Sequence, residues 1–378
     1  MTDRIRTTHV GSLPRPADLL EMINAHDRGQ KVDEVELARV VERSVHAAVR
    51  TQVEVGIDVV SDGEMSKIGY ATYLRHRMSG FEIGDAPRAT PADLDAYPEY
   101  KERLHRSGAT VSYLRPICRA PISYTDRKPL ETDLSTLHAA MDAAGASSAF
   151  MNAPSPGIVA LFQPNEFYPD EDTYLDAIAA ALKTEYDAIV AAGFDLQIDA
   201  PDLGMGRHNK YKHLTDEQFL ARAEVLVEVL DHALRDVPRE RIRMHLCWGN
   251  YEGPHTFDIA VEKVAGLVLR AKPATILCEA ANPRHGNDWA GWAAQRIPDD
   301  TVLCPGVIDT TTNFVEHPNL VAERILRYTD IVGRDRVMAG TDCGFGTFAG
   351  WGGVVEELAW EKLRSLVEGA AVASAKLW

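Results

Sequence analysis

Four side chains with metal-binding chemistry follow short apolar stretches in the second half of the chain: His245, Cys247, Glu279 and Cys343. His245 and Cys247 are two residues apart. On a β-strand, residues i and i+2 point to the same face, so both side chains can reach one ion. Imidazole nitrogen, thiolate sulfur and carboxylate oxygen are all donors for zinc. With Glu279 and Cys343 at the ends of later strands, the spacing predicts one zinc site made of these four residues.

The other three of the five cysteines are predicted to be buried thiols without a metal. Cys278 is next to Glu279, so strand alternation points the two side chains to opposite faces. Cys118 and Cys304 have no partner at ligand spacing. The number of cysteines is odd and they are far apart in a long chain, so no disulfide framework is expected.

The elements that position these residues form an alternating pattern of short apolar stretches and longer amphipathic ones. The predicted strands are 6–11, 57–60, 148–153, 194–199, 242–247, 274–280, 302–308 and 336–341. The clearest helical patterns are 32–55, 171–191, 215–235, 256–271 and 317–332. Strands that alternate with helices pair in parallel. Eight such units predict a closed (β/α)8 TIM barrel, whose catalytic residues lie at the strand C-termini; an open doubly wound sheet is the alternative.

One region does not fit a single strand–helix unit. Residues 80–145 contain a polar stretch followed by VSYLRPICRAPISYTDRKPL (111–130), which is typical of a β-hairpin. We therefore predict a single barrel domain over 1–378, with a β-hairpin-containing insertion at about 80–145.

Composition excludes several classes of protein. The 378 residues include 56 acidic and 40 basic ones, a net charge of −16, and no Lys/Arg-rich block. A nucleic-acid partner or an anionic membrane surface needs the opposite charge, so neither is expected. No apolar run is long enough for a transmembrane helix, and no apolar signal core follows the N-terminus. The expected location is the cytoplasm.

Several motifs resemble the cobalamin-independent methionine synthase superfamily, in order and over nearly the whole chain. They are VGSLPRP (10–16), DGE (62–64), AIAAALKTEYDAIVAAGFDLQIDAP (177–201), HLC (245–247), ILCEAAN (276–282) and GTDCG (340–344). The resemblance implies a catalytic zinc barrel with His245, Cys247, Glu279 and Cys343 as ligands. It also implies that Ser12 and Glu64 contact the thiol substrate and that Asp199 holds its amino group.

Three features depart from that family. The chain has a single barrel, as short forms of the family do. Asp199-Ala200-Pro201 lacks the acid of the family's Asp-Glu-Pro, and Thr311 occupies the position of a catalytic histidine. The barrel is also similar to epoxyalkane:coenzyme M transferase, which joins a thiol to an epoxide at zinc. Both resemblances imply a zinc-bound thiolate that attacks an alkyl donor, either a methyl-folate or an epoxide.

The predicted catalytic residues are His208, as the general acid, and Thr311. His9 and Tyr70 are further candidates for the acid, because the leaving atom needs a proton. Basic residues near predicted strand ends are candidates for binding an anionic substrate group: Lys67, Arg119, Arg207 and Lys210.

Two other classes of function remain as alternatives. A metal-free lyase similar to uroporphyrinogen decarboxylase does not need the His, Cys, Glu and Cys set. A barrel that only stores zinc or a thiol does not need the substrate contacts implied for Ser12, Glu64 and Asp199. The identities of the thiol and the alkyl donor, and the oligomeric state, stay open.

Overall fold

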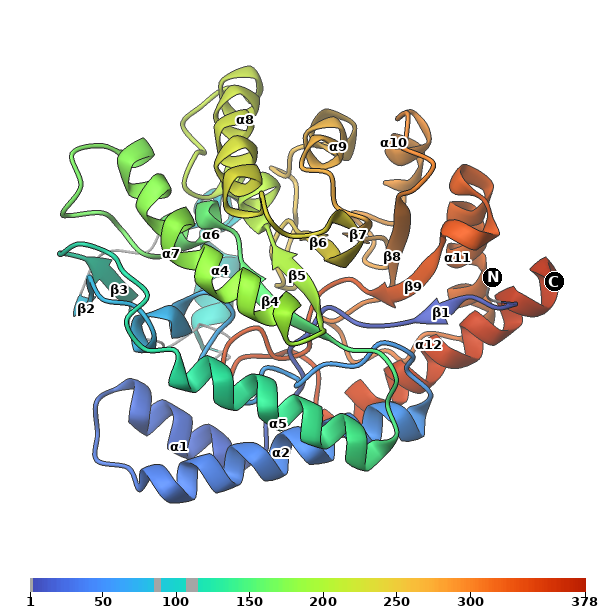
Figure 1. The fold of residues 1–378 in the computed structure, drawn as a ribbon. Coiled ribbons are helices and arrows are strands. Elements are labelled where there is room, and N and C mark those ends of the chain that lie inside the picture. Colours follow the sequence, from blue (N-terminus) through green and yellow to red (C-terminus); the bar gives the residue numbers. More distant parts are fainter. Residues whose placement is uncertain (1–2, 85–89, 107–114) are drawn as a thin grey trace.

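A curved sheet of seven parallel strands forms the centre of the protein (Figure 1). A computed structural model describes residues 3–84, 90–106 and 115–378 of the chain. The strand order is β1-β9-β8-β7-β6-β5-β4. Their bounds are β1 (Arg6–Thr7), β4 (Phe150–Pro154), β5 (Asp195–Asp199), β6 (Ile242–Leu246), β7 (Thr275–Glu279), β8 (Val302–Ile308) and β9 (Met338–Thr341). Seven of the eight predicted strands are therefore confirmed.

The eighth predicted strand, 57–60, connects the two edges of this sheet without forming a full ladder. Val59 donates its N–H to the Thr7 carbonyl at 3.1 Å, and Phe150 donates to the Val60 carbonyl at 3.0 Å. The Asp58 carboxylate accepts the Thr7 N–H at 2.8 Å, so a side chain replaces a strand partner there. The arrangement is consistent with a TIM-like barrel in which this position is irregular.

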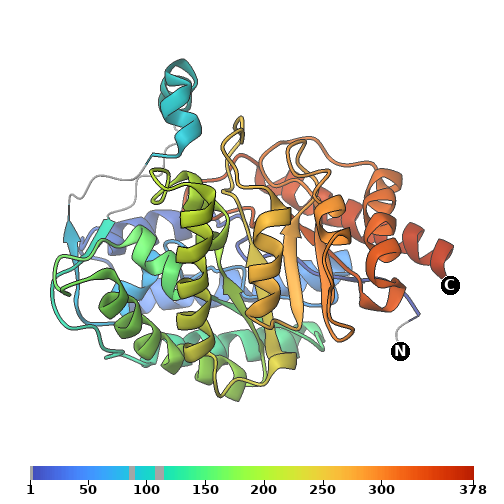
Figure 2. The ribbon, with the colours of Figure 1, turned by 90° about the horizontal axis from the view of Figure 1, so that it is seen from above.

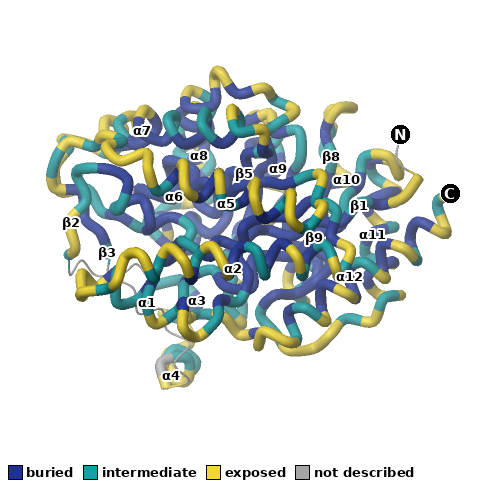
Figure 3. The backbone as a smooth tube through the Cα atoms, turned by 60° about the horizontal axis from the view of Figure 1, so that its bottom comes forward, coloured by how far each residue is buried: buried dark blue, intermediate teal, exposed yellow. Residues whose placement is uncertain are grey.

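Helices surround the sheet, and the buried residues lie between the two layers (Figure 3). The helices outside the insertion's tip are α1 (Ala17–Asp27), α2 (Glu34–Val55), α5 (Lys128–Ala144), α6 (Pro156–Phe162), α7 (Glu171–Ala191), α8 (Asp216–Ala233), α9 (Val261–Arg270), α10 (Trp289–Ala293), α11 (Pro318–Val332) and α12 (Glu356–Leu377). All five predicted helical patterns are present. None of the described helices is long and apolar enough to cross a membrane.

Local sequence explains the ends of these helices. The Asp33 carboxylate accepts the N–H groups of the first turn of α2, and Gly56 ends that helix at φ +100°. Glycine adopts this left-handed conformation without steric cost. Helix α9 begins five residues later than the pattern at 256–271 predicts. Ala260 is its N-cap, and the residues before Ala260 form a loop.

The insertion contains the predicted antiparallel pair, but its strands are not neighbours in sequence. β2 (Phe81–Gly84) pairs with β3 (Arg115–Cys118), whereas a hairpin within 111–130 was expected. Parts of the predicted insertion, 85–89 and 107–114, lie outside the described residues. Between the strands, α3 (Ala92–Ala96) and α4 (Pro98–Arg106) form an arm, and α4 stands away from the barrel (Figure 2).

Candidate active site

Three of the four predicted metal ligands come together at the C-terminal ends of two strands. His245 and Cys247 lie at the end of β6, and Cys343 follows β9. The two sulfur atoms are 3.1 Å apart, and His245 Nε2 is 3.7 Å from the Cys343 sulfur. Donor atoms of all three residues lie within 4.8 Å of one another, and all three residues are buried. We call these residues the thiol–imidazole cluster.

Glu279, the fourth predicted ligand, lies against Cys247, although it is not one of the three residues whose donor atoms lie within 4.8 Å of one another. Its Oε1 accepts the Trp248 N–H at 2.8 Å, and its Oε2 accepts an N–H of the Asn282 amide at 2.7 Å. Burial raises the pKa of this carboxyl to about 8, and Cys247 adds to the rise. Two loops thus hold Glu279: the loop after β6 through the Trp248 N–H, and the loop after β7 through the Asn282 amide.

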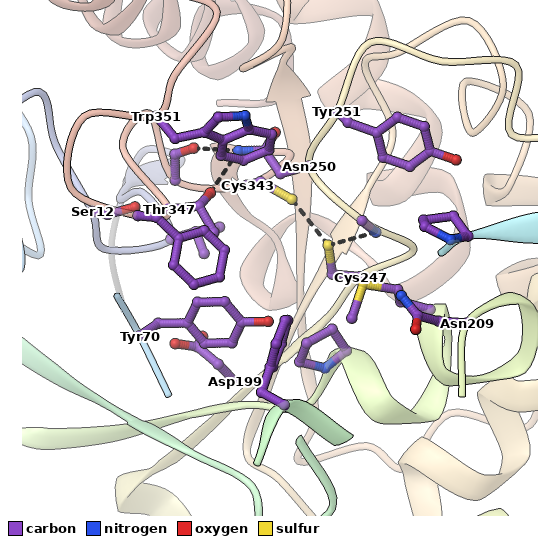
Figure 4. A pocket seen from close by; sticks show the side chains of 18 of the residues that line it. Ser12, Tyr70, Asp199, Asn209, Cys247, Asn250, Tyr251, Cys343, Thr347 and Trp351 are labelled. Carbon is purple, nitrogen blue, oxygen red and sulfur yellow. Dashed lines mark hydrogen bonds between the residues drawn. The ribbon is translucent and has the colours of Figure 1, made fainter. Parts of the chain in front are cut away.

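A cavity of about 480 Å³ opens in front of the thiol–imidazole cluster (Figure 4). Its inner lining contains all three residues for which the sequence implied substrate contact. These are Ser12, Glu64 and Asp199.

Glu64 and Asp199 form a pair of buried carboxylates on the cavity wall. Asp199 is oriented by the amides of Asn152 and Gln197, at 2.9 and 3.0 Å. The Oε2 atom of Glu64 is buried and has no hydrogen-bond partner. Burial raises the pKa of Glu64 to about 8 and also raises that of Asp199. A cationic ligand group would compensate both carboxylates, because burial disfavours two nearby negative charges.

Aromatic side chains form the outer wall of the same cavity. Tyr70, Phe162, Phe348 and Trp351 contact one another with ring centroids 5.7 to 6.2 Å apart. Gly69 permits this packing, because a Cβ atom there would lie 2.4 Å from the Phe348 ring. We call these four residues the aromatic wall; apolar side chains of the arm and of the β5 and β6 loops also line the cavity.

Comparison with known proteins places this chain in a family. The model of the cobalamin-independent synthase catalytic domain matches residues 5–92 and 101–370. The chain belongs to this family. The methionine synthase of Saccharolobus solfataricus is 24% identical over 376 residues, covering 98% of this chain and 95% of that protein. The family predicted from the sequence is therefore confirmed.

Solved structures share the fold. A B12-independent methionine synthase from Shewanella sp. W3-18-1, in complex with selenomethionine, superposes with a TM-score of 0.75 at 18% identity, and 99% of each chain is covered. A second structure, of a Listeria monocytogenes protein described as a putative vitamin-B12 independent methionine synthase, has a TM-score of 0.66 at 19% identity, also over 99% of each chain. Residues 93–100, at the junction of α3 and α4, fall outside the family match.

The predicted catalytic residues do not line the 480 Å³ cavity beside the thiol–imidazole cluster, which we call the main cavity. His208 is fully buried behind Trp248 and hydrogen-bonds its carbonyl at 2.9 Å. Thr311 lines a second cavity, of about 410 Å³, on the other side of Cys343. The Thr311 hydroxyl donates to Asp309 at 2.8 Å. Neither residue is part of the lining of the main cavity, whereas Thr311 and Cys343 both line the second one.

The other candidate acids and cations are mostly engaged elsewhere. His9 is buried and its Nε2 lies 2.7 Å from the Gln52 amide oxygen, whereas Tyr70 does line the cavity. Among the predicted anion-binding residues, Arg207 and Lys210 form ion pairs with Asp216 and Glu171 at 2.8 and 2.6 Å. Arg119 pairs with Glu166 at 2.9 Å, and Lys67 is buried with its ammonium 2.8 Å from the Asn152 carbonyl. Lys101 of the arm, which the sequence did not single out, lines the main cavity and forms an ion pair with Asp95 at 3.6 Å.

Sequence reasoning also missed a buried histidine network behind the cluster. Asp258 accepts hydrogen bonds from His255 at 2.8 Å and from His285 at 2.9 Å. His285 also bonds Asp288 at 2.8 Å and stacks on Trp248, with ring centroids 4.5 Å apart. The sequence carries a signal for this network, since His-x-x-Asp occurs at both 255–258 and 285–288.

Proposed function

We propose that this protein is a zinc-dependent methyltransferase that alkylates the sulfur of an aminothiol, with homocysteine as the model substrate. The observation that carries the proposal is one cavity lined by both the thiol–imidazole cluster and the carboxylates of Glu64 and Asp199. Relatives over nearly the full chain are methionine synthases, which supports the same assignment.

The donor set of the cluster fits zinc. Two thiols and one imidazole are the usual zinc donors, and a catalytic zinc site combines three protein ligands with one position for substrate. His245, Cys247 and Cys343 would hold the ion. Zinc bound there would deprotonate an incoming substrate thiol, which supplies the nucleophilic thiolate.

Glu279 acts on the cluster from outside in this proposal, and this gives a prediction. Glu279→Gln keeps the size of the side chain but removes the ionisable carboxyl beside Cys247 and one of its two acceptor oxygens. We expect the variant to bind one zinc per chain with an affinity about 10- to 100-fold lower, as for residues that support metal ligands. Competition with a chromophoric chelator measures this affinity. Complete loss of zinc would instead make Glu279 a direct ligand.

The carboxylate pair selects the class of thiol. An ammonium group placed between Glu64 and Asp199 would satisfy the unpartnered Glu64 oxygen and would favour the ionised form of both carboxyls, whose pKa values burial raises. A sulfonate thiol such as coenzyme M has no ammonium and adds a negative charge to the same space. The carboxylate pair therefore favours a thiol that carries an amino group, such as homocysteine, over coenzyme M.

The aromatic wall favours a flat methyl donor. Aromatic faces bind planar groups by offset stacking, which is worth about 0.5–1.5 kcal/mol beyond area burial. A methyl-folate presents a planar heterocycle and an acidic tail. The wall would take the heterocycle, and Lys101 at the arm lies on the same cavity for a negative charge.

The carboxylate pair provides the test of this function. We expect Glu64→Gln and Asp199→Asn each to lower kcat/KM for homocysteine by about 10- to 100-fold, since a hydrogen bond to a charged group is worth about 1.5–3 kcal/mol. Zinc content should not change. The matched control is Asp195→Asn at the opposite end of β5, where Asp195 pairs with Arg241.

A thiol substrate without an amino group shows whether Glu64 and Asp199 act on the ammonium group. With 3-mercaptopropionate, wild type and both variants should show the same low rate, because the lost contact is absent from that substrate. An equal loss of rate for both thiols would contradict the assignment of the carboxylates to the ammonium group. Absence of methyl transfer to any aminothiol by zinc-loaded wild type would reject the function itself.

A further inference from the structure

Besides binding a metal ion, the two cysteines of the thiol–imidazole cluster can react with each other. We propose that Cys247 and Cys343 are an oxidisable pair, which a hydroperoxide converts to a disulfide whenever no metal ion holds them. The product would be a protein that cannot take up zinc until a thiol reduces it. This inference concerns the protein alone and does not require that methyl transfer occurs.

The geometry of the two side chains brings the sulfur atoms almost to bonding distance. They are 3.1 Å apart, and a disulfide has an S–S distance of about 2.0 Å, so the sulfur atoms would have to approach by about 1 Å. Cys247 directly follows β6 and Cys343 follows β9. These strands are separated by β7 and β8 in the sheet, so the sulfur atoms meet over the C-terminal mouth of the curved sheet.

A small oxidant can reach both cysteines through the cavities that they line. Cys247 and Cys343 both line the main cavity, and Cys343 lines the second cavity as well. A molecule as small as hydrogen peroxide can therefore reach the Cys343 sulfur from two sides. The three remaining cysteines, Cys118, Cys278 and Cys304, are buried and line neither of these cavities.

The reaction balances with a hydroperoxide as the only co-reactant. One cysteine sulfur attacks the peroxide oxygen and becomes a sulfenic acid, while the peroxide is reduced to water or an alcohol. The sulfur of the second cysteine then displaces the hydroxyl group, which leaves as water, and the S–S bond forms. Two thiols and one hydroperoxide thus give one disulfide, one water and one further water or alcohol.

The consequence for the site follows from the donor count. A disulfide removes both thiolate donors and leaves only His245 of the three-residue cluster. Thiolate is the form that binds zinc, so the oxidised site has too few donors. Conversely, zinc engages both sulfur atoms and should protect them from the peroxide.

The test compares full-length protein with and without zinc. Protein stripped with a chelator, and the same protein reloaded with zinc, are treated with hydrogen peroxide, alkylated and digested without reduction. Mass spectrometry should find one cross-linked peptide pair, Cys247 with Cys343, in the stripped sample only. The stripped and oxidised protein should no longer bind zinc, and dithiothreitol should restore binding.

Two variants separate this pair from general cysteine oxidation. Cys278→Ser removes a buried cysteine that lines neither cavity and should give the same cross-link as wild type. Cys343→Ser should give no intramolecular cross-link at Cys247. Oxidation of stripped wild type only to sulfinic acid, a cross-link between other cysteines, or full zinc uptake after oxidation would each overturn the proposal. Because no activity is measured, none of these results depends on the proposed methyl transfer.

Discussion

Replacing Cys247 with serine is expected to reduce the zinc content from about one ion per chain to nearly none. Among the described residues at this cavity, two cysteine sulfur atoms and one imidazole are the donors that lie within 4.8 Å of one another. The loss of one sulfur leaves two donors. Replacing a residue that only supports a metal ligand already lowers metal affinity or activity by about 10- to 100-fold. Removal of a direct donor should therefore lower turnover by at least ~10²-fold.

Metal analysis of purified protein checks this prediction directly, and turnover with homocysteine checks its consequence. Cys278→Ser is the matched control, because Cys278 is equally buried but lines neither cavity. Both serine variants should fold alike, since cysteine and serine differ little in size. A Cys247→Ser protein that keeps a full zinc complement at wild-type affinity would show that the ion binds elsewhere.

The convergence of His245, Cys247 and Cys343 could be predicted from the sequence because it depends mainly on strand geometry. Cys247 follows His245 by two residues on one strand face, and parallel strands bring their C-terminal ends to one edge. Cys343 follows another strand of the same sheet. The sheet then places these three residues at one edge, and the first residues after β6 and β9 bring the two sulfur atoms together.

Glu279 shows where this reasoning ends. It ends a strand as predicted, but the direction of its side chain is set by two loops, through Trp248 after β6 and Asn282 after β7. Asp342 accepts the backbone N–H groups of residues 280–282 at 2.8 to 2.9 Å, and the amide of Asn282 then holds Glu279. A periodic pattern contains no information on such a clamp. The same is true of His208, since a histidine in a loop can face the cavity or the interior.

The strand at 57–60 and the arm were difficult for related reasons. The apolar stretch at 57–60 is a good strand candidate, but the Asp58 carboxylate takes the N–H that a ladder would use. The arm depends on the pairing of β2 with β3, which are separated by 30 residues, as in Gly84 and Arg115 opposite each other. Long-range pairing of this kind leaves no local signal around 111–130.

A buried ionic cluster beneath the carboxylate side of the cavity should be essential for stability. Arg77 bonds Glu185 at 3.0 Å and also pairs with Asp133, and all three side chains are almost completely buried. The Arg77 guanidinium lies 4.6 Å from the centre of the Tyr73 ring, and the Lys67 ammonium lies 4.7 Å from it. Through Lys67, the cluster is adjacent to the wall that carries Glu64.

Arg77→Met should therefore lower the free energy of unfolding by about 3–5 kcal/mol at pH 7, because it removes the direct partner of two buried carboxylates and leaves only the charge of Lys67 to offset them. Burial by itself raises the pKa of Glu185, but Arg77 and its other neighbours bring it below the usual value. Burial raises the pKa of Asp133 even in the presence of Arg77. Without Arg77, both carboxyls should titrate above their unfolded-state pKa of about 4.

The sign of the pH dependence follows from that change. Folded Arg77→Met protein binds more protons than its unfolded chain above pH 4, so its stability falls as the pH rises. Wild-type Glu185 has a lowered pKa and contributes stability that is present above pH 4 and lost on acidification. The deficit of the variant should therefore be small at pH 5 and large at pH 8, as measured by urea unfolding at both values.

Arg39→Met supplies the control, because Arg39 is exposed and pairs with Glu36 on the surface of α2. Its unfolding midpoint should match that of wild type at both pH values, since exposed ion pairs contribute little. A deficit of Arg77→Met that stays constant with pH would contradict the argument. It would mean that lost packing of the arginine, and not the uncompensated charge of Glu185 and Asp133, destabilises the variant.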